Sequence, residues 1–114
     1  MSNILFGDRT FQLWEYRVSH GSLLIRSPIG PGVTTNIDII CVGVEYLAVP
    51  RFLRNMQIVE PTADELCVLE EILAKPLMLT ATRIFTVSDK RFPIVAAGFK
   101  IDENENDIFD SPFE

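Results

Sequence analysis

The stretch PTADELCVLEEILAKP, at residues 61–76, is the feature that most constrains the fold. Thr62 can cap a helix, and Glu65 follows three residues later, which is the spacing of a capping box. Pro76 ends the pattern, because proline disfavours a helical conformation in the residue before it. Apolar residues between these limits recur at helical spacing. We therefore expect one main helix at about residues 62–75, whose apolar stripe consists of Leu66, Leu69, Ile72 and Leu73.

The remainder of the chain consists of segments with the composition of β-strands, separated by residues typical of turns. TFQLWEYRVSH and SLLIRS flank Gly21, while TRIFTVSD and RFPIVAAGFKID flank SDKR, so each pair predicts a β-hairpin. Strands and helices do not alternate, which favours antiparallel pairing. The sequence thus predicts an α+β fold in which an antiparallel sheet of about five to seven strands, built from hairpins, packs on the one helix.

Residues 37–49 leave two arrangements open. The run is almost continuously apolar, as in a strand covered on both faces, but Gly43 interrupts it. A glycine inside a strand marks a bulge or separates two strands of a hairpin. We favour one long bent strand over a hairpin.

Acidic residues are concentrated at the C-terminal end. The formal net charge of the 114 residues is −6, and six acids with no base follow Ile101. Residues 1–101 are then neutral, and their number suits one domain. We expect a single α+β domain at residues 1–101, followed by an acidic tail at residues 102–114. Neither part has the basic face that engages phosphates, so we expect no nucleic-acid partner.

Cellular location can be inferred only from general features. No run of about 18 apolar residues is present, which excludes a membrane-spanning helix, and the N-terminal residues lack the pattern of a secretory signal. Cys41 and Cys67 lie in apolar surroundings, as free cysteines in a core do. We expect a cytoplasmic protein of bacterial type. The mean hydropathy of +0.21 is high for a small soluble chain, which leaves a homodimer open.

Catalytic constellations are weak in this sequence. His20 is the only histidine, and the chain contains no Cys/His spacing that would hold zinc. His20 adjoins Gly21 at a predicted turn. An exposed histidine is a simpler interpretation of this position than a catalytic base. The acids around Cys67 oppose a lowered thiol pKa. We therefore expect no enzymatic activity and no cofactor or metal.

A calcium loop is the nearest metal motif, and it fails. Asp102, Asn104 and Asn106 match the alternating oxygen ligands that open such a loop. Asp107 then replaces the glycine of the sharp turn, and Phe113 replaces the closing glutamate.

A small-molecule pocket is the alternative function that we retain. Ligand sites are mostly apolar and carry a few polar anchors. The candidate lining residues are Trp14, Tyr16, Arg17 and Tyr46.

The tail combines acids with aromatic residues. A purely solvating tail needs no aromatic side chain, so Phe109 and Phe113 predict docking, either onto the domain itself or onto a partner. We interpret the chain as a non-enzymatic protein-interaction module that binds a basic partner, with an immunity or inhibitor protein as one version. The predicted contact residues are Asp102, Glu103, Glu105, Asp107, Phe109, Asp110 and Phe113.

Overall fold

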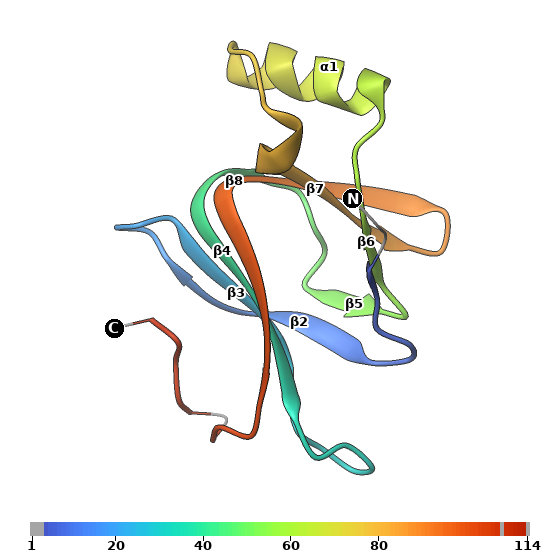
Figure 1. The fold of residues 1–114 in the computed structure, drawn as a ribbon, viewed down its shortest axis with the longest axis vertical. Coiled ribbons are helices and arrows are strands. Elements are labelled where there is room, and N and C mark those ends of the chain that lie inside the picture. Colours follow the sequence, from blue (N-terminus) through green and yellow to red (C-terminus); the bar gives the residue numbers. More distant parts are fainter. Residues whose placement is uncertain (1–3, 108, 114) are drawn as a thin grey trace.

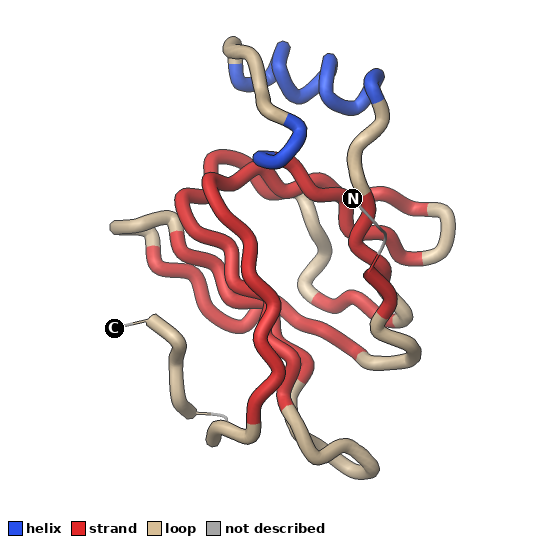
Figure 2. The backbone as a smooth tube through the Cα atoms, viewed as in Figure 1, coloured by secondary structure: helices blue, strands red, loops and turns tan. Residues whose placement is uncertain are grey.

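The computed structural model describes residues 4–107 and 109–113, which fold into a curled antiparallel sheet and one main helix (Figures 1 and 2). The strand order is β1-β6-β7-β8-β4-β3-β2-β5, so the two predicted hairpins, β2–β3 and β7–β8, are confirmed. The elements are β1 (Ile4–Leu5), β2 (Thr10–Arg17), β3 (Ser22–Ser27), β4 (Asn36–Leu47), β5 (Phe52–Arg54), β6 (Gln57–Val59), α1 (Ala63–Leu73), a 3-10 turn (Leu79–Ala81), β7 (Thr82–Val87) and β8 (Lys90–Asn104).

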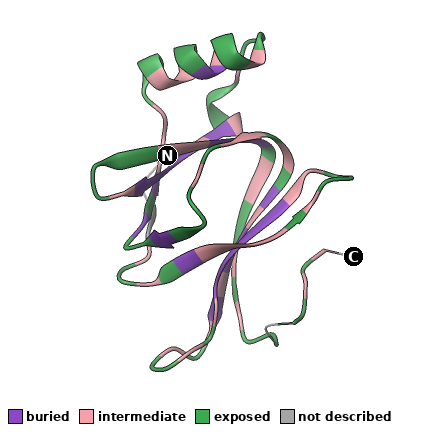
Figure 3. Cartoon of the chain, turned by 180° about the vertical axis from the view of Figure 1, so that it is seen from behind, coloured by how far each residue is buried: buried purple, intermediate pink, exposed green. Residues whose placement is uncertain are grey.

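The α+β class that the sequence predicts is confirmed, with a sheet of eight strands in the described residues when the two-residue β1 is included. The sheet buries its inner face around Phe11, Ile25, Ile39 and Phe85, each at most 1% exposed. Figure 3 shows that the buried residues are concentrated in the strands, whereas α1 is mostly exposed or intermediate. Because successive strand residues point to opposite faces, the same strands also present an outer face with a different composition.

Strand β4 is one bent strand, as we favoured, and not a hairpin. It pairs with β8 along its whole length, and the register shifts between Val44 and Tyr46. The bend follows Gly43, whose φ of +62° suits glycine. A Cβ atom at this position would lie 2.9 Å from the Cβ atom of Ala97, so the close approach also requires glycine.

Helix α1 lies over one end of the sheet (Figure 1). Its predicted capping box is present: the Glu65 amide donates to Thr62 Oγ1, and the Thr62 amide donates to Glu65 Oε1. The predicted apolar stripe is only partly covered. Leu69 is buried, but Ile72 is more than half exposed. Cys67, which we expected in the core, is exposed because it lies on the side of α1 away from the sheet, whereas Cys41 is buried. No helix in the described ranges is long and apolar enough to cross a membrane.

Glu65 also ties α1 to the sheet. Arg91 Nε and Nη2 donate to its two carboxylate oxygens at 2.8 and 2.9 Å. The hydrogen bonds from Arg91, followed by those from Thr62, lower the pKa of Glu65 below its ordinary value of 4.5, although partial burial acts in the opposite direction. Above pH 4.5 the charged carboxylate therefore stabilises the folded state.

This contribution predicts a pH-dependent effect of Glu65→Gln, which keeps an acceptor for the capping box but removes the charge. At pH 7 the variant should have a lower free energy of unfolding than the wild type. Because the folded-state pKa is depressed, the difference should shrink as the pH falls from about 4.5 through the folded pKa. Urea unfolding at several pH values measures it. A constant difference across this range would contradict the assigned ion pair.

Candidate functional site

A row of polar residues crosses the outer face of the sheet. Gln12 of β2 pairs with Arg26 of β3, Arg26 pairs with Asp38 of β4, and Asp38 pairs with Asp102 of β8. Residues in direct register lie side by side on the same face. Four strands therefore place polar side chains next to one another, with the opposite charges of Arg26 and Asp38 in the middle of the row.

The centre of this row is a buried ion pair. Arg26 Nε donates to Asp38 Oδ1 at 2.6 Å, and Arg26 Nη2 donates to Asp38 Oδ2 at 3.0 Å. The two side chains are 1% and 2% exposed. Such burial is unusual for arginine, which is almost never fully buried unless it is paired. The paired carboxylate and the segments that cover Arg26 exclude solvent from it.

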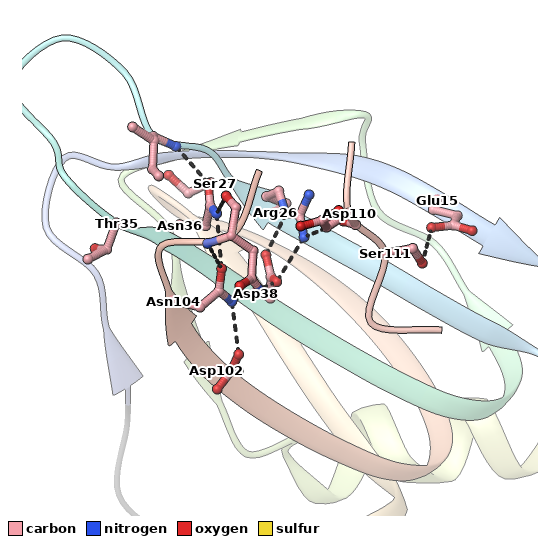
Figure 4. Close-up of polar contacts among 12 residues, drawn as sticks. Glu15, Arg26, Ser27, Thr35, Asn36, Asp38, Asp102, Asn104, Asp110 and Ser111 are labelled. Atoms are coloured by element: carbon pink, nitrogen blue, oxygen red, sulfur yellow. Dashed lines mark hydrogen bonds and ion pairs between the residues drawn. The ribbon is translucent and has the colours of Figure 1, made fainter. Parts of the chain in front are cut away.

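Amide side chains extend the ion pair into a network (Figure 4). Asn104 Nδ2 donates to Asp38 Oδ2 and to Asp102 Oδ2, at 3.1 and 2.8 Å. Asn36 Nδ2 in turn donates to Asn104 Oδ1 at 3.0 Å. Asn36 Oδ1 accepts from the amide of Ile29 at 2.8 Å, so the network also holds the loop between β3 and β4.

The C-terminal segment closes over this network. It turns back at the end of β8 and lies beside β3 and β2 (Figure 1). Asn36 donates to the carbonyl of Asn106 at 2.8 Å, and Arg26 donates to the carbonyl of Asp110 at 3.3 Å. Ser111 Oγ donates to Glu15 at 2.7 Å, as Figure 4 shows. Part of the tail therefore docks on its own domain.

Arg17 and Glu15 complete the surface on which the C-terminal segment packs. Arg17 Nε donates to Glu15 Oε2 at 2.7 Å, and the Arg17 guanidinium lies 5.6 Å from the centre of the Phe113 ring. The hydrogen bond from Ser111, followed by that from Arg17, lowers the pKa of Glu15 below its ordinary range. Glu15 therefore stays ionised and retains Ser111 at neutral pH.

The predicted partner-binding residues fall into three groups. Strand β8 continues to Asn104, so Asp102 and Glu103 belong to the sheet, and Glu103 accepts from the Thr35 hydroxyl at 2.6 Å. Phe113 is half-buried. Exposed positions beyond β8 are occupied by Glu105, Asp107, Phe109 and Asp110.

Three of these exposed residues form a turn that we call the C-terminal turn (Asp107, Phe109 and Asp110). The Phe109 amide donates to Asp107 Oδ1 at 2.8 Å, and the Asp110 amide donates to the Asp107 carbonyl at 2.9 Å. The Phe109 side chain is left 89% exposed between two exposed carboxylates.

The four residues of the alternative ligand site are only partly brought together. Trp14 and Tyr16 line a cavity of about 300 Å³. Tyr46 lines a different cavity beside α1. The register of β2 on β3 shifts between Leu13 and Glu15, and the Trp14 ring lies 5.4 Å from the Arg26 guanidinium. The Arg17 guanidinium is engaged by Glu15 and Phe113, so the ligand site stays a prediction without a shared cavity.

Groups that could perform chemistry are sparse in the described residues. Ser19 Oγ lies 3.0 Å from His20 Nδ1 in the exposed β2–β3 turn. Burial raises the pKa of the Cys41 thiol to about 12, which opposes its use as a nucleophile. Within residues 4–107 and 109–113, no group of three or more acidic, cysteine or histidine side chains is arranged to hold a metal ion.

Comparison of the chain with known protein families, with curated proteins and with solved structures finds no match. Its function is therefore argued from its own geometry.

Sequence reasoning missed the residues that anchor the tail, which are Arg26, Asn36 and Asp38. One signal was present. In NIDI, at residues 36–39, polar and apolar residues alternate inside an otherwise apolar strand. Such alternation indicates a polar outer face. It does not reveal that the C-terminal segment covers that face.

Removing the Ser111 hydroxyl should loosen the segment without unfolding the sheet. In Ser111→Ala, Glu15 loses the bond from Ser111 while the core is unchanged. Heteronuclear NOE values for residues 109–113 should fall, and Ser111→Thr, which keeps a hydroxyl, should retain them. Unchanged NOE values in Ser111→Ala would show that this bond does not hold the segment.

Proposed function

We propose that the protein is a non-enzymatic interaction module that binds a basic partner protein through its C-terminal turn. The main support is the exposure of Phe109, which is 89% exposed, whereas Phe113 is half-buried. A large aromatic side chain held in water has apolar area to bury on binding. Aromatic residues are among the most frequent energetic anchors of protein interfaces.

The surroundings of Phe109 define the chemistry of the partner. Asp107 and Asp110 flank it, and Glu105 is exposed nearby in the sequence. A carboxylate cluster attracts a basic surface and accelerates the encounter. The expected complementary surface has arginine or lysine residues around an apolar pocket that receives one aromatic ring.

The turn is also restrained before any partner arrives. Asp107 accepts two backbone hydrogen bonds within it, and Ser111 fixes the chain immediately after it. Preorganisation of this kind reduces the conformational entropy lost on binding. The sequence predicted docking either onto the domain itself or onto a partner. Phe113 lies against the domain, beside Arg17, and we assign docking onto a partner to Phe109.

A protein that neutralises a basic toxin is one version of this proposal, supported by the acidic charge and small size of the chain. Location in the cytoplasm belongs to the proposal as well. Two free cysteines suit a reducing compartment. Self-association as a homodimer remains a prediction.

Phe109→Ala tests the proposal directly. The full-length chain, immobilised and exposed to cell extract at low salt, should retain a basic protein that is identified by mass spectrometry. Loss of a dominant aromatic anchor typically costs at least about 2 kcal/mol. The partner should therefore bind the variant roughly 30-fold more weakly, since each 1.4 kcal/mol is a factor of about ten.

Phe52→Ala is the matched control, because Phe52 is also an exposed phenylalanine but lies on β5. It should retain the partner. Asp107→Asn with Asp110→Asn should slow association and reduce its dependence on salt. Equal binding by the wild type and Phe109→Ala would overturn the proposal.

A further inference from the structure

Helix α1 is fastened to the sheet mainly at its two ends. Glu65, in its first turn, binds Arg91 of β8, and Lys75, just beyond its last turn, binds Glu45 of β4. Between these ion pairs, Leu69 is the one helical residue in α1 that is buried. The middle of the helix therefore stands over the sheet without the continuous apolar contact that usually stabilises a surface helix.

A groove of about 290 Å³ opens beneath the helix. This volume is near the lower end of the roughly 300–1,000 Å³ typical of ligand sites, which suits side chains of a partner better than a large ligand. The apolar walls come from α1 and from strands β4, β7 and β8. They consist of Tyr46, Val68, Leu69, Ile72, Ile84 and Pro93.

Two branched aliphatic residues at this groove are more exposed than buried. Val68 is 56% exposed and Ile72 is 53% exposed. They lie four residues apart, and therefore on one side of the helix. Covering them would remove apolar surface from water, which favours binding.

Charge around the groove selects among the possible occupants. Asp64 and Glu65 lie at the groove, and Glu71 is exposed on the same helix. The two nearby bases, Lys75 and Arg91, are already engaged by carboxylates. In the described part of the chain, neither Asp64 nor Glu71 has a basic partner. The groove thus offers apolar walls with an excess of negative charge at the rim.

This charge disfavours both occupants that the chain itself could supply. A second copy would bring the same acidic helix against the groove, and like charges would repel. The acidic C-terminal segment is anchored on the outer face, away from α1 (Figure 1). A basic segment with aliphatic side chains complements both the walls and the rim.

We propose that the groove between α1 and strands β7 and β8 docks a basic amphipathic segment of a partner protein, with leucine or isoleucine side chains as anchors. Helix-in-groove recognition of this type presents apolar residues about one helical turn apart. The surface is separate from the C-terminal turn, so the inference does not depend on the proposed role of Phe109. A partner that carries two basic regions could use both surfaces.

Synthetic peptides provide the probe. One is a helical amphipathic peptide of leucine and lysine, and the other is its counterpart with glutamate at every lysine position. Each is titrated into the full-length, ¹⁵N-labelled chain. The lysine peptide should shift the amide signals of α1 and of Tyr46 and Ile84, and the glutamate peptide should bind at least tenfold more weakly.

Variants separate this groove from the C-terminal turn. Ile72→Ser should weaken the shifts at α1 at least tenfold, whereas Met78→Ser, at an exposed apolar residue outside the groove lining, should leave them unchanged. Phe109→Ala should also leave them unchanged, even if the peptide additionally contacts the C-terminal turn. Thermal unfolding followed by circular dichroism checks that each variant is folded.

Three results would overturn the inference. Peptide shifts confined to the C-terminal turn would remove the groove as a site. Equal affinity for the lysine and glutamate peptides would show that the rim charge selects nothing. Concentration-dependent self-association in sedimentation, abolished by Ile72→Ser, would identify a second copy as the occupant.

Discussion

The arrangement of the outer face depends on the ion pair between Arg26 and Asp38. Both side chains are almost completely removed from water. Desolvation of two charges is expensive, and it is offset only when the geometry is good and the remaining hydrogen-bonding atoms are satisfied. Here Asp38 accepts from both Arg26 and Asn104, and Arg26 also reaches the backbone of the C-terminal segment. The buried ion pair is therefore stable only with the hydrogen bonds of Asn104 and the C-terminal segment, and these groups are in turn positioned by the pair.

That mutual requirement links parts of the chain that lie far apart in sequence. Asn36 joins the loop after β3 to the end of β8, and its amide also holds the carbonyl of Asn106. The C-terminal segment is consequently folded back against β2 and β3. Its geometry leaves Phe109 directed to solvent, while Phe113 lies beside Arg17. Two separate surfaces, the C-terminal turn and the groove under α1, each combine exposed apolar side chains with acidic residues.

Local signals explain how much of this could be predicted from the sequence. The capping box at Thr62, the hairpins and the bend at Gly43 each depend on residues close in sequence, and each prediction is confirmed. The burial of Arg26 could not be predicted this way. It depends on a carboxylate 12 residues away and on a carbonyl 84 residues away. Likewise, composition does not distinguish Phe109 from Phe113, because the contacts that fix the segment, such as those of Asp110 with Arg26 and of Ser111 with Glu15, are distant in sequence. The exposure of Cys67 and Ile72 depends on how ion pairs hold α1 against the sheet. The spacing of apolar residues in the helix does not specify this placement.

A double-mutant cycle on Arg26 and Asp38 tests the central claim most directly. Urea unfolding gives the free energy of unfolding of the wild type, Arg26→Met, Asp38→Leu and the double variant. Removal of one partner leaves the other charge buried and uncompensated, so each single variant should lose about 3–5 kcal/mol. The double variant should recover most of that loss, because no charge is then left without its partner. Single variants within about 1 kcal/mol of the wild type, or losses that simply add in the double variant, would contradict the account.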